Sequence, residues 1–152
     1  MSRTKPKVLA IASGGGHWVQ LLRLRPAFEG CDVVFATAKE GYRADVGDAE
    51  FRVIVDGNRS NKIRLLQSLW SVFSLLKKER PDVVISTGAA PGYFALKIGR
   101  LLGMKTIWVD SIANAEELSM SGAKAGDCAD LWLTQWPHLA REGGPSCLGN
   151  VL

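Results

Sequence analysis

Short apolar runs alternate with longer amphipathic segments along most of the chain. Six runs are rich in β-branched residues and almost continuously apolar, at 7–12, 32–37, 52–55, 82–86, 106–110 and 131–134. Such runs are typical of strands that are buried on both faces of a parallel sheet. Helical segments fill three of the intervals between them, at 17–28, 62–79 and 92–102. The alternation predicts an α/β fold, in which a Rossmann-like open parallel sheet carries helices on both faces.

The length and composition fit one globular domain over residues 1–152. Hydrophobic residues make up 47% of the chain and charged residues 22%, which is ordinary for such a domain. The net charge of +4 is too small for a dedicated nucleic-acid binder, so we expect no nucleic acid as a partner. The three cysteines, Cys31, Cys128 and Cys147, have neither metal-binding spacing nor an even count. They predict no metal site and favour a reducing compartment.

A glycine-rich turn follows the first predicted strand, where ligands bind in open α/β sheets. We call Ser13-Gly14-Gly15-Gly16-His17 the glycine turn. Its glycines allow backbone N–H groups to approach an anion, and the start of the next helix adds partial positive charge. His17 could donate a hydrogen bond or act as a base. The spacing matches neither the dinucleotide-binding nor the Walker pattern, and a plain strand–helix turn stays open as the alternative.

A second turn with the same character follows the predicted strand 82–86. It contains Thr87, Gly88 and Ala89, and Pro91 or Gly92 is expected to start the next helix. Both turns lie at the carboxyl ends of parallel strands and therefore at the same edge of the sheet. Together they could hold the two phosphates of a diphosphate.

The predicted helix 62–79 is apolar over an unusually wide arc. Its apolar side chains cover roughly two-thirds of the helix circumference, against a stripe of about 100° for a helix that packs on one core. Arg59 and Lys62 lie at the start of the segment, and Arg64 lies on its narrow polar face. The helix either packs between the sheet and a neighbour, or lies in a bilayer surface or docks a partner. No apolar stretch reaches the roughly 18 residues that a spanning helix needs, so we expect a cytoplasmic protein with peripheral membrane contact.

Four motifs, in this order, resemble one family over almost the whole chain. They are SGGGH after the first strand, RPDVVISTGA near the middle, VDSIAN followed by LSMSG, and ADLWLTQWP. The family is the membrane-docking, acceptor-side subunit of two-component GT-B glycosyltransferases. It includes the accessory subunit of dolichyl-diphosphate N-acetylglucosamine transferase and bacterial forms from exopolysaccharide and capsule synthesis.

The resemblance implies the N-terminal half of a GT-B glycosyltransferase. Such a subunit binds a lipid-linked diphosphate acceptor and recruits a small donor-binding subunit, which uses a UDP-sugar, to the cytoplasmic face of the membrane. The sugar-transfer site forms between the two proteins, so we expect this chain to be inactive alone and to need no cofactor. Eukaryotic members carry an N-terminal spanning helix that this sequence lacks. We therefore expect membrane attachment through Arg3, Lys5, Lys7 and the wide apolar helix.

The resemblance also assigns roles to residues, motif by motif. Residues implied to bind the acceptor diphosphate are Gly14, Gly15, Gly16, His17, Thr87, Gly88, Ala89 and Ser111. Residues expected at the membrane or the partner are Arg59, Lys62, Arg64, Trp70, Phe73, Gln135 and Trp136. Glycosyl transfer needs a base for the acceptor hydroxyl. We expect Asp110 as the base and His17 as a contact to the diphosphate or the hydroxyl.

A second class of function competes with this one. A Rossmann-like chain of this size could be a stand-alone nucleotide-binding domain, either an oxidoreductase or a ligand-sensing module. The absent G-x-G-x-x-G pattern, and the absent acidic residue after the second strand, count against it.

Overall fold

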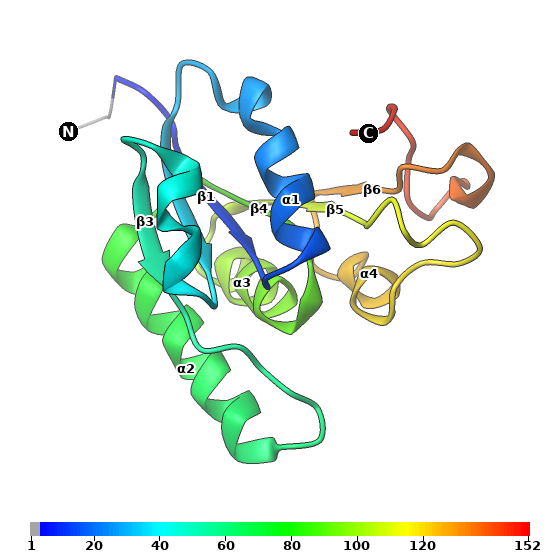
Figure 1. Cartoon of the computed structure of the whole chain (residues 1–152). Coiled ribbons are helices and arrows are strands. Elements are labelled where there is room, and N and C mark those ends of the chain that lie inside the picture. Colours follow the sequence, from blue (N-terminus) through cyan, green and yellow to red (C-terminus); the bar gives the residue numbers. More distant parts are fainter. Residues whose placement is uncertain (1–3) are drawn as a thin grey trace.

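Six parallel strands form one sheet in the order β3-β2-β1-β4-β5-β6 in a computed structural model that describes residues 4–152 (Figure 1). The strands are β1 Lys7–Ala12, β2 Asp32–Thr37, β3 Glu50–Val53, β4 Val83–Gly88, β5 Lys105–Val109 and β6 Leu131–Leu133. This order is that of a Rossmann sheet, with the crossover between β1 and β4. The predicted fold class is confirmed. Arg3, one of the expected membrane contacts, lies outside the described residues.

Helices cover both faces of the sheet (Figure 1). They are α1 Gly16–Arg23, α2 Lys62–Glu79, α3 Ala89–Leu101 and α4 Met120–Ala125, with 3₁₀-helices at Arg25–Phe28, Glu40–Val46 and Pro137–Leu139. Alternate residues of β1 enter different cores because successive strand side chains point to opposite faces. Leu9 packs with α2 and α3, whereas Ala10 packs with Trp18 of α1.

Several predicted boundaries are wrong for local reasons. The predicted helix 17–28 divides into α1 and the 3₁₀-helix Arg25–Phe28, since Pro26 disfavours α-helical backbone at the residue before it. Helix α3 begins at Ala89, three residues earlier than expected, directly after β4. Strand β3 begins at Glu50 rather than at residue 52. Helix α4 and the 3₁₀-helix Glu40–Val46 were not predicted.

A buried carboxylate attaches the end of α2 to the sheet. Glu79, 5% exposed, accepts from Lys7 Nζ of β1 at 2.9 Å and from Arg52 Nε of β3 at 2.8 Å. Burial raises the pKa of Glu79, but these two cations lower it by more, so the pKa lies below the ordinary 4.5. Lys7 is therefore engaged within the domain, at the edge opposite the glycine turn, and not free for the membrane contact expected of it.

All the strand-to-helix turns meet at one edge because every strand is parallel. The glycine turn, the second turn and the segment after β5 lie there, and α2 also begins on that side (Figure 1). The first half of α2 extends beyond the rest of the domain. Within residues 4–152, no helix is long and apolar enough to span a bilayer.

Candidate functional site

The glycine turn leaves backbone donors open at the start of α1. Gly15 and Gly16 are exposed, and Gly15 has a left-handed φ of 70°, which a glycine adopts without strain. No acidic side chain lies in the first turn of α1 and no side chain caps it. Its first N–H groups therefore lack intrahelical partners and face solvent, an arrangement that favours a bound anion.

His17 is held in one orientation by the second turn. Its Nδ1 lies 3.1 Å from the carbonyl oxygen of Thr87, and Thr87 Oγ1 donates to the backbone oxygen of His17 at 2.6 Å. Because a carbonyl oxygen only accepts, Nδ1 carries the proton. A neutral ring then presents Nε2 as an acceptor, which is the orientation that a general base needs.

Gly88 completes this arrangement by having no side chain. A Cβ on Gly88 would collide with the His17 ring, and the φ of Gly88 is 152°. Its N–H donates to Ser86 Oγ at 3.1 Å. Thr87 and Gly88 are both buried, and the contacts that they make here position His17. Ala89, whose left-handed φ is 65°, is partly exposed at the start of α3. The expected diphosphate contacts of these residues stay predictions.

The opposite side of the glycine turn is covered by a segment that sequence reasoning missed. The hydroxyl of Tyr42 accepts from Gly15 N at 3.1 Å, and its ring stacks on Trp18 at 5.5 Å. Trp18 in turn donates from Nε1 to Asp45 Oδ2 at 3.0 Å. An aromatic residue shortly after a predicted strand tip was the only signal, and periodicity does not register a 3₁₀-helix.

Asp110 is buried and fully hydrogen-bonded. It is 1% exposed. Its Oδ1 accepts from Trp108 Nε1 at 3.1 Å and Ser119 Oγ at 2.6 Å, while Oδ2 accepts from Ser119 N at 2.9 Å and Asn114 Nδ2 at 3.2 Å. Two hydrogen bonds on each oxygen leave little capacity for a substrate proton. The geometry gives Asp110 the task of shaping the segment 110–119. Its role as base stays a prediction, and the better-placed acceptor is His17 Nε2.

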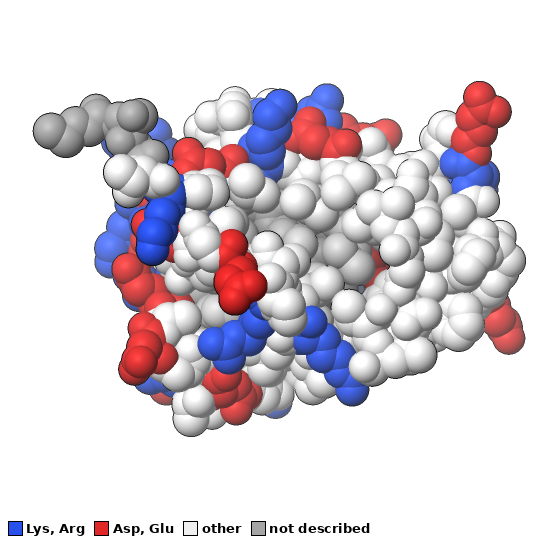
Figure 2. Space-filling model, turned by 90° about the horizontal axis from the view of Figure 1, so that it is seen from above, with Lys and Arg blue, Asp and Glu red and all other residues white. Residues whose placement is uncertain are grey.

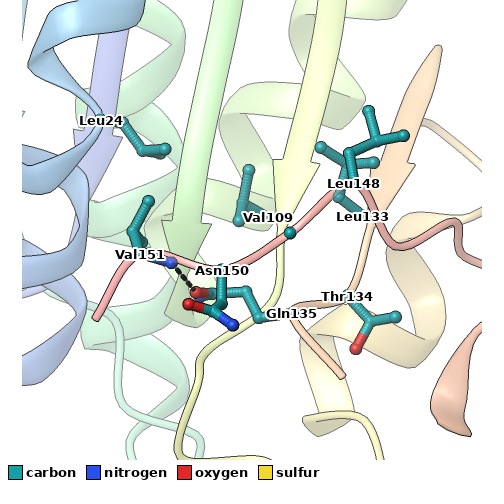
Figure 3. A pocket seen from close by; sticks show the side chains of 9 residues that line it. Leu24, Val109, Leu133, Thr134, Gln135, Leu148, Asn150 and Val151 are labelled. Carbon is teal, nitrogen blue, oxygen red and sulfur yellow. Dashed lines mark hydrogen bonds between the residues drawn. The ribbon is translucent and has the colours of Figure 1, made fainter. Parts of the chain in front are cut away.

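A buried amide network lies behind the glycine turn. Gln20 of α1 donates to Ser111 Oγ at 2.9 Å and accepts from Gln135 Nε2 at 2.6 Å. Gln135 Oε1 accepts from Val151 N at 2.8 Å (Figure 3). Ser111 and Gln135 are 7% and 3% exposed. The expected contact of Gln135 with a partner is not supported by this placement, because its amide is enclosed by its own chain. Ser111 likewise faces inward, and its expected diphosphate contact stays a prediction.

The C-terminal segment crosses an apolar hollow beside this network. A cavity of about 200 Å³ lies between Leu24, Val109, Leu133 and the segment 148–151 (Figure 3). Seen from above, the face of the molecule is hollowed near its centre and poor in charge there, while charged side chains gather at its margins (Figure 2). Trp136 is half-buried and donates from Nε1 to the Ile112 carbonyl at 2.7 Å.

Helix α2 exposes much of its apolar arc, so of the two alternatives that the pattern left open, a neighbouring element that covers the whole arc is absent within residues 4–152. Ile63, Leu66 and Trp70 are 70%, 65% and 68% exposed. Phe73 is partly buried and packs against the Trp70 ring at 5.7 Å. The opposite side of the helix supplies buried residues to the core, which include Val72 and Leu76. The core therefore covers only part of the apolar arc of α2, and the rest of the arc is exposed. Three exposed cations flank it, namely Arg59, Lys62 and Arg64.

The fold and the site define a class: a Rossmann-like domain with an exposed glycine turn at the start of α1, as in one half of a GT-B glycosyltransferase. MurG from Acinetobacter baumannii matches with a TM-score of 0.77 and 17% identity, over 97% of this chain and 46% of that chain. UDP-N-acetylglucosamine 2-epimerase from Rickettsia bellii matches with a TM-score of 0.68 and 14% identity, over 88% of this chain and 40% of that chain. The chain thus spans less than half the length of these two proteins, and they establish its fold.

The chain belongs to the family described as oligosaccharide biosynthesis protein Alg14 like, which matches residues 50–147. The human UDP-N-acetylglucosamine transferase subunit ALG14 is 27% identical, over 99% of this chain and 85% of that protein. The subunit of the same name from Yarrowia lipolytica is 23% identical, over 91% of this chain and 77% of that protein. The resemblance seen in the motifs is confirmed, and a stand-alone nucleotide-binding domain is not favoured.

Proposed function

We propose that this chain is the acceptor-side subunit of a two-component glycosyltransferase that uses a UDP-sugar. The observation that carries the proposal is the match to a family whose relatives are named as transferase subunits. This chain covers 85% of the human relative named as a transferase subunit, whereas its match covers 46% of the MurG chain. A second, donor-binding protein would supply the remaining half of the site. The family description supports a reaction in oligosaccharide biosynthesis. The proposed product is a lipid-linked oligosaccharide, an exopolysaccharide or a capsule.

The acceptor is a saccharide on a lipid diphosphate, bound at the glycine turn. The exposed N–H group of Gly16 and the uncapped first turn of α1 suit phosphate oxygens. The acceptor hydroxyl then lies near His17. During transfer, the hydroxyl oxygen bonds to the anomeric carbon of the donor sugar, UDP leaves with the electron pair of the broken bond, and His17 Nε2 takes the hydroxyl proton.

The outward face of α2 is the proposed membrane contact. Ile63, Leu66 and Trp70 form an apolar strip, and the cations beside it complement anionic lipid headgroups. The helix begins at the same edge of the sheet as the glycine turn (Figure 1). A lipid whose tail lies in the bilayer would thus present its diphosphate toward the glycine turn. This geometry supports peripheral attachment, and we propose the cytoplasmic face as its side.

Reconstitution with a companion protein tests the proposal. The companion is a small glycosyltransferase encoded beside this chain. Transfer from UDP-N-acetylglucosamine, or another UDP-sugar, to a polyprenyl-diphosphate-linked sugar is expected only when both proteins are present. Robust transfer by this chain alone would refute the two-component proposal.

Substitutions at His17 test the assignment of the base. His17→Gln should lower turnover of the pair by about 10²–10⁴-fold, the usual cost of losing a base. Gly88→Ala should also lower it, because the new Cβ displaces the His17 ring. Gly41→Ala is the matched control, since a Cβ there meets nothing within 4 Å. Full activity of His17→Gln in an assembled pair would place the base elsewhere.

A further inference from the structure

The two sides of the glycine turn differ in the polar groups that they leave free. On the β4 side, the Gly88 N–H and the Thr87 hydroxyl already have partners. On the β2 side, Lys39 and Tyr42 approach Gly14, with Lys39 Cδ 3.7 Å and the Tyr42 ring 3.3 Å from where a Cβ on Gly14 would lie. The β2 side is therefore the one that still has donors to offer.

Lys39 carries an unneutralised charge beside the turn. It is exposed, and among residues 4–152 its ammonium group has neither an ion-pair partner nor a hydrogen bond. The adjacent carboxylate, Glu40, is engaged by the guanidinium of Arg43, whose Nη2 donates to it at 3.2 Å. The Arg43 hydrogen bond holds the pKa of Glu40 below its ordinary value. Glu40 thus stays paired with Arg43 and leaves Lys39 available for an anion.

The Tyr42 hydroxyl accepts a hydrogen bond but donates none within the described residues. Its oxygen accepts from Gly15 N, and no acceptor for its own proton lies within the part of the chain that the structure describes. A Tyr hydroxyl both accepts and donates. Stacking on Trp18, which is 1% exposed, fixes the ring in place. The hydroxyl proton is therefore held at the glycine turn, ready for an oxyanion.

The position of these residues in the fold indicates which part of a ligand they meet. In Rossmann sheets, a phosphate sits at the start of α1, and the group attached to it lies over the end of β2. Lys39 and Tyr42 follow β2 directly. For a ligand with two linked phosphates, one phosphate on the α1 amides brings the second within reach of the ammonium group and the hydroxyl.

We propose that Lys39 and Tyr42 bind the second phosphate and thereby select a diphosphate over a monophosphate. The inference rests on the proposed function, since it takes the glycine turn as the site of the first phosphate. A charge-assisted hydrogen bond is worth enough to change affinity by about tenfold. Wild-type protein should therefore prefer the diphosphate by about this factor or more.

Binding of two soluble probes to the purified chain tests the selectivity. The probes are farnesyl diphosphate and farnesyl monophosphate, measured by isothermal titration calorimetry. Lys39→Gln should weaken diphosphate binding by about tenfold and change monophosphate binding by less than about twofold. Tyr42→Phe keeps the ring on Trp18 and should reduce the same ratio. Lys105→Gln is the charge-matched control, because the exposed Lys105 begins β5 at the opposite edge of the sheet.

The possible results distinguish the role of Lys39 and Tyr42 from the proposed acceptor-side function. A wild-type preference for diphosphate that both variants retain overturns the inference and leaves the proposed function standing. Failure of wild-type protein to bind either probe overturns both. Phosphatidylglycerol vesicles form a third arm. If Lys39→Gln weakens binding to these vesicles as much as to the diphosphate, Lys39 senses anionic headgroups in general and the inference is wrong.

Discussion

Replacing Asp110 by Asn distinguishes a structural carboxylate from a catalytic one. In the native protein, each carboxylate oxygen accepts two hydrogen bonds inside the domain. An Asn side chain has one oxygen and one NH₂ group, so two of the four donors would face another donor. Trp108, Asn114 and Ser119 are the residues whose groups compete for the single remaining oxygen.

The expected loss of stability follows from these contacts. A buried donor left without a partner costs about 1–3 kcal/mol, so two of them cost about 2–6 kcal/mol. Native domains are stable by about 5–15 kcal/mol. For a domain of this size, 1 kcal/mol shifts the midpoint of thermal unfolding by about 2–4 °C. Asp110→Asn should therefore lower the Tm by about 4–24 °C.

Thermal unfolding and turnover, measured on the same variants, show whether Asp110 is structural or catalytic. Circular dichroism supplies the Tm, and the reconstituted pair supplies turnover well below it. Ser119→Ala is the graded control: it removes one hydroxyl donor to Asp110 and the N-cap bond to Gly122 N, and should cost about 1–2 kcal/mol. An Asp110→Asn protein with the native Tm would refute this reasoning. If that protein also lost about 10²-fold or more in turnover, Asp110 would be the base.

Two further predictions concern α2. Changing Trp70 and Phe73 to Ser should release the protein from anionic vesicles in a cosedimentation assay and leave its circular dichroism spectrum intact. The control is Leu101→Ser, at a residue that is 81% exposed at the end of α3, which should not change binding. Unchanged binding of the α2 variant would mean that this face does not meet lipid. Glu79 has a lowered pKa, so its charge stabilises the fold above about pH 4.5 and this contribution is lost as the pH falls through the folded-state pKa. Glu79→Gln should therefore lower the Tm at pH 7 and flatten its decline below pH 4.5; an equally steep decline would contradict the coupling.

The sequence by itself determined the class of fold and the place of the glycine turn. Buried parallel strands are apolar along their whole length, and helices repeat every 3.6 residues, so both patterns are local and readable. A turn of three glycines after a strand allows backbone N–H groups to approach an anion, and this too is a local feature. The width of the apolar arc of α2 could also be predicted, because it depends only on the residues around the helix axis. The structure was needed to show that part of this arc is exposed.

Only the tertiary structure decided which polar residues are free. Asp110 and Gln135 were expected to contact substrate or partner, yet both are buried. Donors two to nine residues away enclose the Asp110 carboxylate, and Gln135 bonds to Gln20, 115 residues away. Tyr42 reaches Gly15 across 27 residues, through a 3₁₀-helix with no sequence period. Hydrogen bonds between distant segments depend on how strands are ordered in space, and a linear pattern does not contain that order. A carboxylate in water and one that accepts four internal hydrogen bonds are the same letter in the sequence, and folding alone separates their chemistry.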